Sequence, residues 1–281
     1  MSQMAELAPS LEAAPRVPGR AAAWGGRLRR YLPAALVFIL ALVLWEWAVG
    51  AFNIQNFLLP RPSVIAATFV DQFRIVVPAG LFTLRESLGG FALGCALGVL
   101  VALATARWTA VSEGLLPFAV LVNSTPIVAL APIMNNWFGI TNPLAKMSIV
   151  AVLVFFPVMI NTVRGLTQVD PAALELMRSY AARELTVLRQ LRLPNALPYM
   201  FSAFKVASTL SIIGAIVSEY FGGSREALGI YISQQAALFH FAQAWAGILV
   251  ACAIGIAFYG LILVCERLLL PWHVSLRAAG D

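Results

Sequence analysis

Side chains that could do chemistry are scarce in this sequence. Cys95, Cys252 and Cys265 each lie within an apolar run, and their spacing fits neither a metal site nor a disulfide framework. We therefore expect them to be small packing residues. His240 and His273 are far apart, make no metal site with the cysteines, and belong to no compelling Ser-His-Asp spacing. The sequence predicts no catalytic residue, no metal site and no enzyme.

A phosphate-binding loop is also missing. The lysines of the chain are Lys146 and Lys205, and neither follows a glycine, so the motif G-x-x-x-x-G-K-[ST] does not occur. We expect no cofactor to be bound by this chain. Any dependence on ATP has to come from another chain.

Charged side chains instead gather in one segment between two apolar runs. Asp170 followed by Pro171 is typical of a helix start, with an N-cap and a proline in the first turn. Apolar residues then recur at steps of three and four and predict one apolar helix face. They are Leu174, Met177, Ala181, Leu185 and Leu188. The segment is too short and too charged to cross a bilayer, so it lies on the headgroups or binds a groove on a cytoplasmic partner.

Composition indicates the solvent of the remaining chain. Of the 281 residues, 60% are hydrophobic and 11% are charged, whereas soluble domains carry about 25% charged residues. A chain this apolar would aggregate in water, so the lipid bilayer is its expected solvent.

Six apolar runs approach the ~20 residues that span ~30 Å of hydrocarbon as a helix. Backbone groups in lipid have to pair within their own segment, which favours helices. We therefore expect an all-α membrane protein with six transmembrane helices. The runs cover roughly residues 31–52, 81–106, 115–137, 144–163, 197–220 and 244–270. Between the first two, Pro62 and Ser63 predict a short interfacial helix to about Phe73, with an ordinary loop as the alternative.

Arginine placement predicts the orientation. With the N-terminus in the cytoplasm, the inner segments hold most of the arginines, and only a few basic residues lie outside. The net charge of +6 is then a topology signal and not a nucleic-acid footprint. We divide the chain into a flexible cytoplasmic segment, a first transmembrane helix with the outer helix, a core that includes the cytoplasmic loop 164–197, and a cytoplasmic tail. These are residues 1–30, 31–80, 81–270 and 271–281.

Two of the runs carry further patterns. Gly90, Gly94 and Gly98 are four residues apart and predict a packing seam, either within the subunit or across a dimer. The third run holds polar residues, which at membrane depth line a passage or form hydrogen bonds between helices. These are Asn123, Ser124 and Thr125. Pro126 and Pro132 should bend this helix.

Asn135 and Asn136 follow in the same run. They contribute to substrate choice or mark the outer end of the helix. Few charged residues lie within the spans. Arg85, beside Glu86, is a candidate to attract an anion or neutralise an acid, and Glu219 is expected to have a structural role. The sequence shows no cluster of buried acids, so it gives no support to a proton relay.

The charged loop resembles a known family. Permease subunits of binding-protein-dependent ABC importers carry Glu-Ala-Ala, three residues, Gly, nine residues and Ile-x-Leu-Pro in a cytoplasmic loop. Here Glu175-Leu176-Met177 is followed by three residues, Ala181, nine residues and Leu191-Arg192-Leu193-Pro194. The spacing matches throughout, while Leu176, Met177 and Ala181 replace the two alanines and the glycine.

The resemblance extends from about Leu81 to the sixth run. The segments Asn123–Pro126, Trp137–Gly139 and Glu219–Gly222 resemble the branch that imports sulfonates, taurine, nitrate or pyrimidine-type vitamin precursors. The resemblance implies a homodimer in the inner membrane, two ATPase subunits that hold ATP and Mg, and an extracytoplasmic binding protein that delivers a small solute.

For the loop, the resemblance implies contact with the ATPase. The residues concerned are Glu175, Leu176, Met177, Arg178, Ala181, Leu193 and Pro194. Two other hypotheses remain open at this point. A secondary transporter would need inverted repeats and coupling-ion residues, and a membrane scaffold would need no passage.

Overall fold

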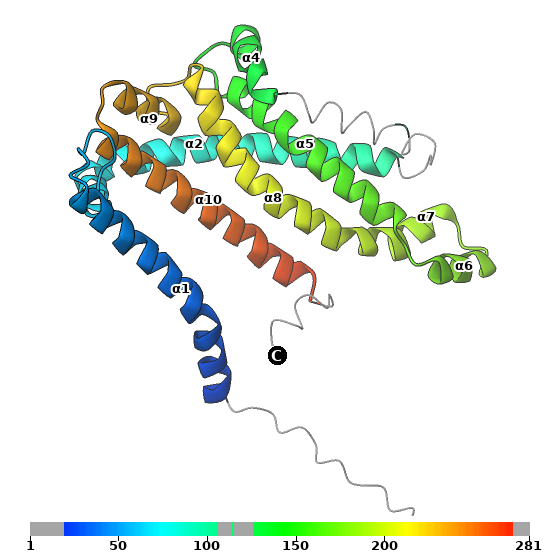
Figure 1. Ribbon diagram of the computed structural model, residues 1–281. Helices are drawn as coiled ribbons and strands as arrows, with labels where there is room; N and C mark the ends of the chain where they lie inside the picture. The colour runs from blue at the N-terminus through cyan, green and yellow to red at the C-terminus, as the bar shows by residue number, and fades with distance from the viewer. Residues whose placement is uncertain (1–19, 106–113, 115–125, 272–281) are drawn as a thin grey trace, which may run out of the picture. The chain divides into compact units, whose positions relative to one another are not determined.

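The computed structural model describes residues 20–105, 114 and 126–271. The chain divides into two compact units, Met1–Ile54 and Gln55–Asp281. In the first unit, α1 (Arg20–Ala51) is a single helix, and its stretch Leu32–Ala51 is long and apolar enough to cross a membrane (Figure 1). Most of the described large apolar side chains on α1 are exposed, as expected for a helix whose solvent is lipid.

The second unit is built from helices throughout its described residues. A 3₁₀ turn at Ile127–Leu130 precedes α4, and a π-helical turn at Leu188–Arg192 joins α7 to α8. The helices are α2 (Pro62–Thr105), α4 (Ala131–Phe138), α5 (Pro143–Thr167), α6 (Pro171–Ser179), α7 (Glu184–Val187), α8 (Leu193–Tyr220), α9 (Leu228–Ala237) and α10 (Phe241–Leu269).

The expected all-α membrane fold is confirmed. Five stretches of the described chain are long and apolar enough to cross a bilayer. They are Leu32–Ala51, Pro62–Thr105, Pro143–Thr167, Glu184–Tyr220 and Phe241–Leu269. Of the third expected crossing, residues 115–137, the structure describes only the second half, residues 126–137.

The described end of that third run corrects a prediction. Pro126 is not helical, and the chain then forms the 3₁₀ turn before α4 begins at Ala131. Pro132 was expected to bend a continuous helix, but it lies in the first turn of α4, where a proline costs no hydrogen bond.

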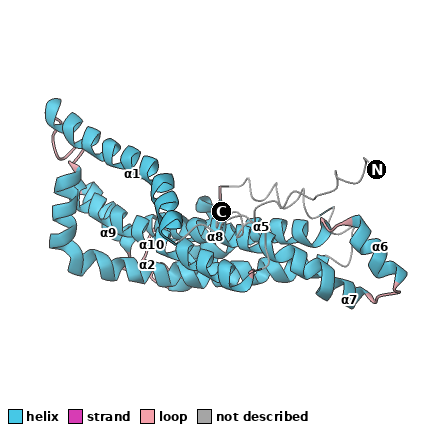
Figure 2. Cartoon of the chain, turned by 90° about the horizontal axis from the view of Figure 1, so that it is seen from below, coloured by secondary structure: helices cyan, strands magenta, loops and turns pink. Residues whose placement is uncertain are grey.

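A second correction concerns the segment after the first crossing. The short interfacial helix expected to end near Phe73 is not separate, because α2 continues without interruption from Pro62 to Thr105. At 1.5 Å per residue its 44 residues extend for about 66 Å, twice the thickness of the hydrocarbon core. The helix changes direction along its length (Figure 2), and Pro78 inside it removes one backbone donor.

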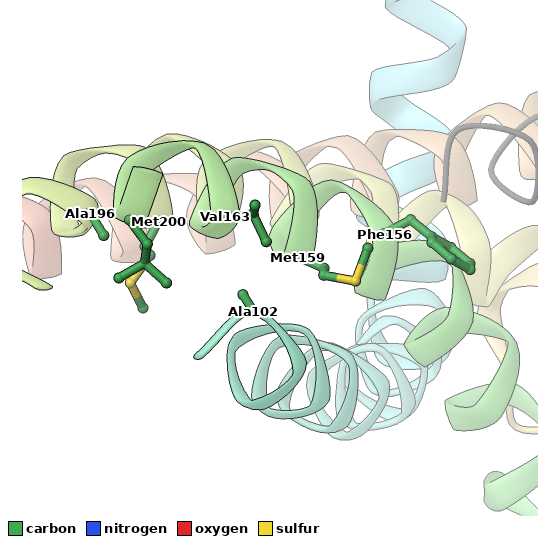
Figure 3. Packing of buried hydrophobic residues seen from close by; sticks show 7 residues of the cluster. Ala102, Phe156, Met159, Val163, Ala196 and Met200 are labelled. Atoms are coloured by element: carbon green, nitrogen blue, oxygen red, sulfur yellow. The ribbon is translucent and has the colours of Figure 1, made fainter. Parts of the chain in front are cut away.

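Close packing of α2, α5 and α8 forms the core of the second unit. A Cβ atom on Gly90, Gly94 or Gly98 of α2 would lie 2.5–2.9 Å from the nearest atoms of α5, so all three glycines face that helix. Ala102 of α2 points toward the α5 side chains Met159 and Val163 (Figure 3). Small residues on α2 thus bring the two backbones close enough for dispersion contacts to hold them in lipid.

Helices α5 and α8 run antiparallel and give the unit two ends (Figure 1). We call the end that carries α6 and α7 the loop end, and the end that carries α4 and α9 the cap end. At the cap end, Val76 and Ala79 of α2, Leu228 and Ile232 of α9 and Val250 of α10 form a separate apolar cluster. The sequence did not predict a separate helix at the position of α9.

Candidate functional site

Helix α6 begins where the sequence predicts. The Asp170 side chain accepts a hydrogen bond from the Ala172 backbone N–H at 3.0 Å, and Pro171 occupies the first turn. This side chain satisfies one of the donors that every helix start leaves unpaired. No residue of α6 is buried, and its exposed side chains include Glu175, Leu176 and Arg178.

The predicted single amphipathic helix ends early, which corrects the sequence analysis. At Ala181 the backbone adopts φ = 51°, a left-handed conformation. The Ala181 N–H donates to the Arg178 carbonyl at 2.9 Å, and the Ala182 N–H donates to the Met177 carbonyl at 3.0 Å. This pattern of hydrogen bonds is a Schellman motif, in which the residue with the left-handed conformation is usually glycine. The position that corresponds to the glycine of the resembled loop motif is therefore the residue with positive φ.

Beyond this turn the chain is tied back to α5. Leu193 and Pro194 open α8, and the Asn195 side-chain amide donates to the Gly165 carbonyl at 2.8 Å and the Gln168 carbonyl at 2.9 Å. A Cβ on Gly165 would lie 2.7 Å from the Ala196 Cα. The two helices that flank the loop are thus in direct backbone contact at its base.

The exposed surface of the loop mixes apolar and charged side chains. Leu176, Tyr180 and Leu185 are exposed by 57%, 76% and 57%. Glu175, Arg178, Arg183 and Arg189 are also exposed. Amphipathic surfaces of this kind bind either a membrane interface or a complementary groove on another protein.

The structure describes two of the five residues expected along a passage, Asn135 and Asn136. Asn123, Ser124 and Thr125 lie outside the described residues. Asn136 is exposed, whereas Asn135 is buried and its amide donates to the Phe221 carbonyl at 3.1 Å. Arg85 is exposed on α2.

At the cap end the structure contains a polar group that sequence reasoning missed. Its members come from four helices and are at most 5% exposed, and we call them the cap cluster. They are Thr83 and Glu86 of α2, Asn135 of α4, Lys146 of α5 and Glu219 of α8. The expectation that no buried acids cluster is wrong. The residues are separated by up to 136 positions, and the only local signal is the spacing of Thr83, Glu86 and Ser87 on one face of α2.

A second ionic contact lies nearer the loop end. The Lys205 Nζ of α8 contacts both carboxylate oxygens of Glu266 on α10, at 3.0 and 2.8 Å. This ion pair joins two spanning helices. Charged side chains within membrane spans commonly pair with one another in this way.

Comparison with known proteins decides the family. Residues 94–270 match the family described as binding-protein-dependent transport system inner membrane component. The chain belongs to this family. The permease is 30% identical over 246 residues to the formylaminopyrimidine transport permease of Halalkalibacterium halodurans, an alignment that covers 86% of this chain and 96% of the relative. The family expected from the spacing of the loop is confirmed.

Two further comparisons agree. The permease is 28% identical over 246 residues to the riboflavin transport system permease of Chloroflexus aurantiacus, covering 87% of this chain and 90% of the relative. Its fold resembles the crystal structure of an amino acid ABC transporter with histidines, with a TM-score of 0.57 and 18% identity. That match covers 70% of the permease and 95% of the solved chain. The permease is thus a multi-pass inner-membrane component of a binding-protein-dependent ABC importer.

Proposed function

We propose that the permease forms the passage of an importer whose energy comes from two ATPase subunits docked on the loop 164–197. The observation that carries the proposal is the geometry of α6. This short helix is capped at Asp170, ended by the Ala181 turn, free of buried residues and held at its base by the Asn195 bonds to α5. A rigid, exposed, amphipathic helix suits a docking element.

The proposed partners follow from the family description, which requires a binding protein, and from the lack of a phosphate loop in this chain. ATP and Mg are held by the ATPase subunits. Two copies of the permease pair in the membrane, and the binding protein delivers solute at the cap end. The arginine distribution supports a cytoplasmic loop end and cytoplasmic termini.

The mechanism we propose is a lever. Closure of the ATPase dimer moves α6, and the movement passes into α5 and α8 together because Asn195 and the Gly165–Ala196 contact bind their ends. The two helices then tilt as a rigid body, which is a common form of alternating access. Glu175, Leu176, Met177 and Arg178 form the contact, Ala181 shapes its end, and Leu193 and Pro194 start the driven helix.

The proposed solute is a small nitrogen-containing heteroaromatic compound. The two relatives are named for formylaminopyrimidine and riboflavin, both of which contain such rings. A small anion such as a sulfonate, taurine or nitrate is the alternative. Uptake of radiolabelled candidates from each class into cells that express the permease, its ATPase and its binding protein distinguishes the two.

Co-purification tests the docking proposal. We expect Glu175→Arg to reduce the amount of ATPase recovered with the tagged permease by about tenfold, because charge reversal in a matched contact is repulsive. The matched control is Glu226→Arg, the same change at an exposed glutamate of the cap end, which should leave recovery unchanged. Full recovery of the ATPase with Glu175→Arg would show that Glu175 is not part of the contact.

A further inference from the structure

The first turn of α9 is capped by two other helices. Its N-cap residue, Ala227, offers no side-chain acceptor. The Leu228 N–H donates instead to the Thr83 Oγ1 of α2 at 2.9 Å, and the Gly229 N–H donates to the Glu219 Oε2 of α8 at 2.6 Å. The donors that a helix start leaves unpaired are thus satisfied in a way that fixes the position of α9.

Glu219 has the surroundings of an ionised carboxylate. Its side chain is fully buried, and each oxygen accepts a hydrogen bond, one from the Thr83 hydroxyl at 2.7 Å and one from the Gly229 N–H. The N-terminus of α9 adds a positive dipole end. A Cβ on Gly229 would lie 2.6 Å from the Glu219 Oε2, so only glycine allows this approach.

Glu86 has the opposite surroundings. It is 3% exposed and lies one helical turn after Thr83, the residue of α2 that bonds Glu219, while its Oε2 meets no donor among the described residues. An ionised carboxylate buried without donors is strongly disfavoured, and two ionised carboxylates in contact repel each other. A protonated carboxyl supplies its own O–H, and Glu219 is an acceptor within reach.

Lys146 supplies the positive charge of the cluster. Its Nζ, on a residue 1% exposed, donates to the Asn135 Oδ1 at 2.6 Å and the Ile140 carbonyl at 2.7 Å. A Cβ on Gly223 would lie 3.5 Å from the Lys146 Cε and 3.8 Å from the Glu219 Cα, so Lys146 lies close to Glu219. Asn135 then donates to the carbonyl of Phe221, the residue that follows α8. One ammonium, one carboxylate and one neutral acid give a cluster without net charge, which suits a buried site.

We propose that Glu86 holds a proton and donates it in a hydrogen bond to ionised Glu219, so that Glu86, Glu219 and Lys146 form a neutral positioning cluster. The cluster joins α9 to α2 and α8, and α4 to α5 and the end of α8. The cap end therefore moves as one body when α5 and α8 tilt. This role rests on the proposed function, whereas the position of the proton does not.

A mirrored pair of substitutions tests the role. Glutamine is a neutral isostere of a protonated glutamic acid and keeps a donor, so Glu86→Gln should keep ATP-driven uptake within about twofold of the wild type. Glu219→Gln replaces one of the two carboxylate oxygens with an NH₂ group, which then faces the donor of either Thr83 or Gly229. Uptake should therefore fall about tenfold or more. The ATPase should co-purify normally with both variants, because the loop end is unchanged.

Infrared spectroscopy on the full-length permease locates the proton without any ATPase. The carbonyl band of a protonated carboxylic acid should be present in the wild type and absent in Glu86→Gln. Identical spectra of these two proteins would overturn the proposal, as would a loss of uptake in Glu86→Gln that equals the loss in Glu219→Gln. Failure of the wild type to need ATP would contradict the proposed function, while the spectra would still decide the protonation of Glu86.

Discussion

At the scale of single residues, Ala181 is the clearest compromise in the molecule. It holds φ = 51° at the end of α6, where a side chain with a Cβ is disfavoured by about 1 kcal/mol or more relative to glycine. The importer motif that the loop resembles has glycine at this position. The permease thus forms the same turn, but the turn is less stable with alanine at position 181 than it would be with glycine.

Replacement of this residue gives a direct prediction. Ala181→Gly should stabilise the loop by about 1 kcal/mol, because it relieves the left-handed strain without removing a buried contact. Slower amide hydrogen exchange at residues 182 and 183 would report it. Ala173→Gly, within α6, is the matched control. It should speed amide exchange in α6, because glycine in a helix interior is about 1 kcal/mol less favourable than alanine. Equal or faster exchange in Ala181→Gly would contradict the account.

The sequence predicts some of this site and misses the rest for a physical reason. Asp170 and Pro171 locate the start of α6, because helix caps are local signals. The break at Ala181 is hidden, since Leu185 and Leu188 continue the apolar period past the turn. The cap cluster is hidden for another reason: Glu86, Lys146 and Glu219 meet only when α2, α5 and α8 pack.

At the scale of elements, the seam between α2 and α5 is a central part of the core of the second unit. Gly94 is its tightest point, since an added Cβ would lie 2.5 Å from the Ala151 carbonyl oxygen and 3.0 Å from its Cα. Both atoms belong to the backbone and cannot move aside as a flexible side chain would. The sequence predicts this seam from glycine spacing but leaves open whether it joins helices of one subunit or of two; in the structure the three glycines face α5 of the same chain.

Substitution at the seam should therefore be destabilising. We expect Gly94→Ala to lower the stability of the purified permease by about 1–3 kcal/mol, because it forces the helices apart. Gly255→Ala on α10 is the matched control, since nothing lies within 4 Å of its added Cβ. Thermal unfolding in detergent compares the two. Equal midpoints for Gly94→Ala and the wild type would show that α2 and α5 are not packed through Gly94.

At the scale of the whole molecule, the permease has five described stretches that can span a membrane, and its sequence contains no phosphate-binding loop. Its family is named for dependence on a binding protein. In the proposed mechanism, movement begins outside this subunit, at the ATPase, and passes through α6 to α5 and α8. The apolar runs of the sequence predict where the five described spans lie, because lipid imposes one simple rule on all of them. It does not predict α9 or the continuity of α2, which depend on packing.

ATP-driven uptake is the measurement that tests the central claim most directly. The permease, its ATPase and its binding protein are placed in proteoliposomes, and solute accumulation is followed with and without enclosed ATP. We expect accumulation only with ATP hydrolysis, loss of at least about tenfold with Glu175→Arg, and wild-type accumulation with Glu226→Arg. Accumulation without ATP, or undiminished accumulation with Glu175→Arg, would contradict an importer driven through the loop 164–197.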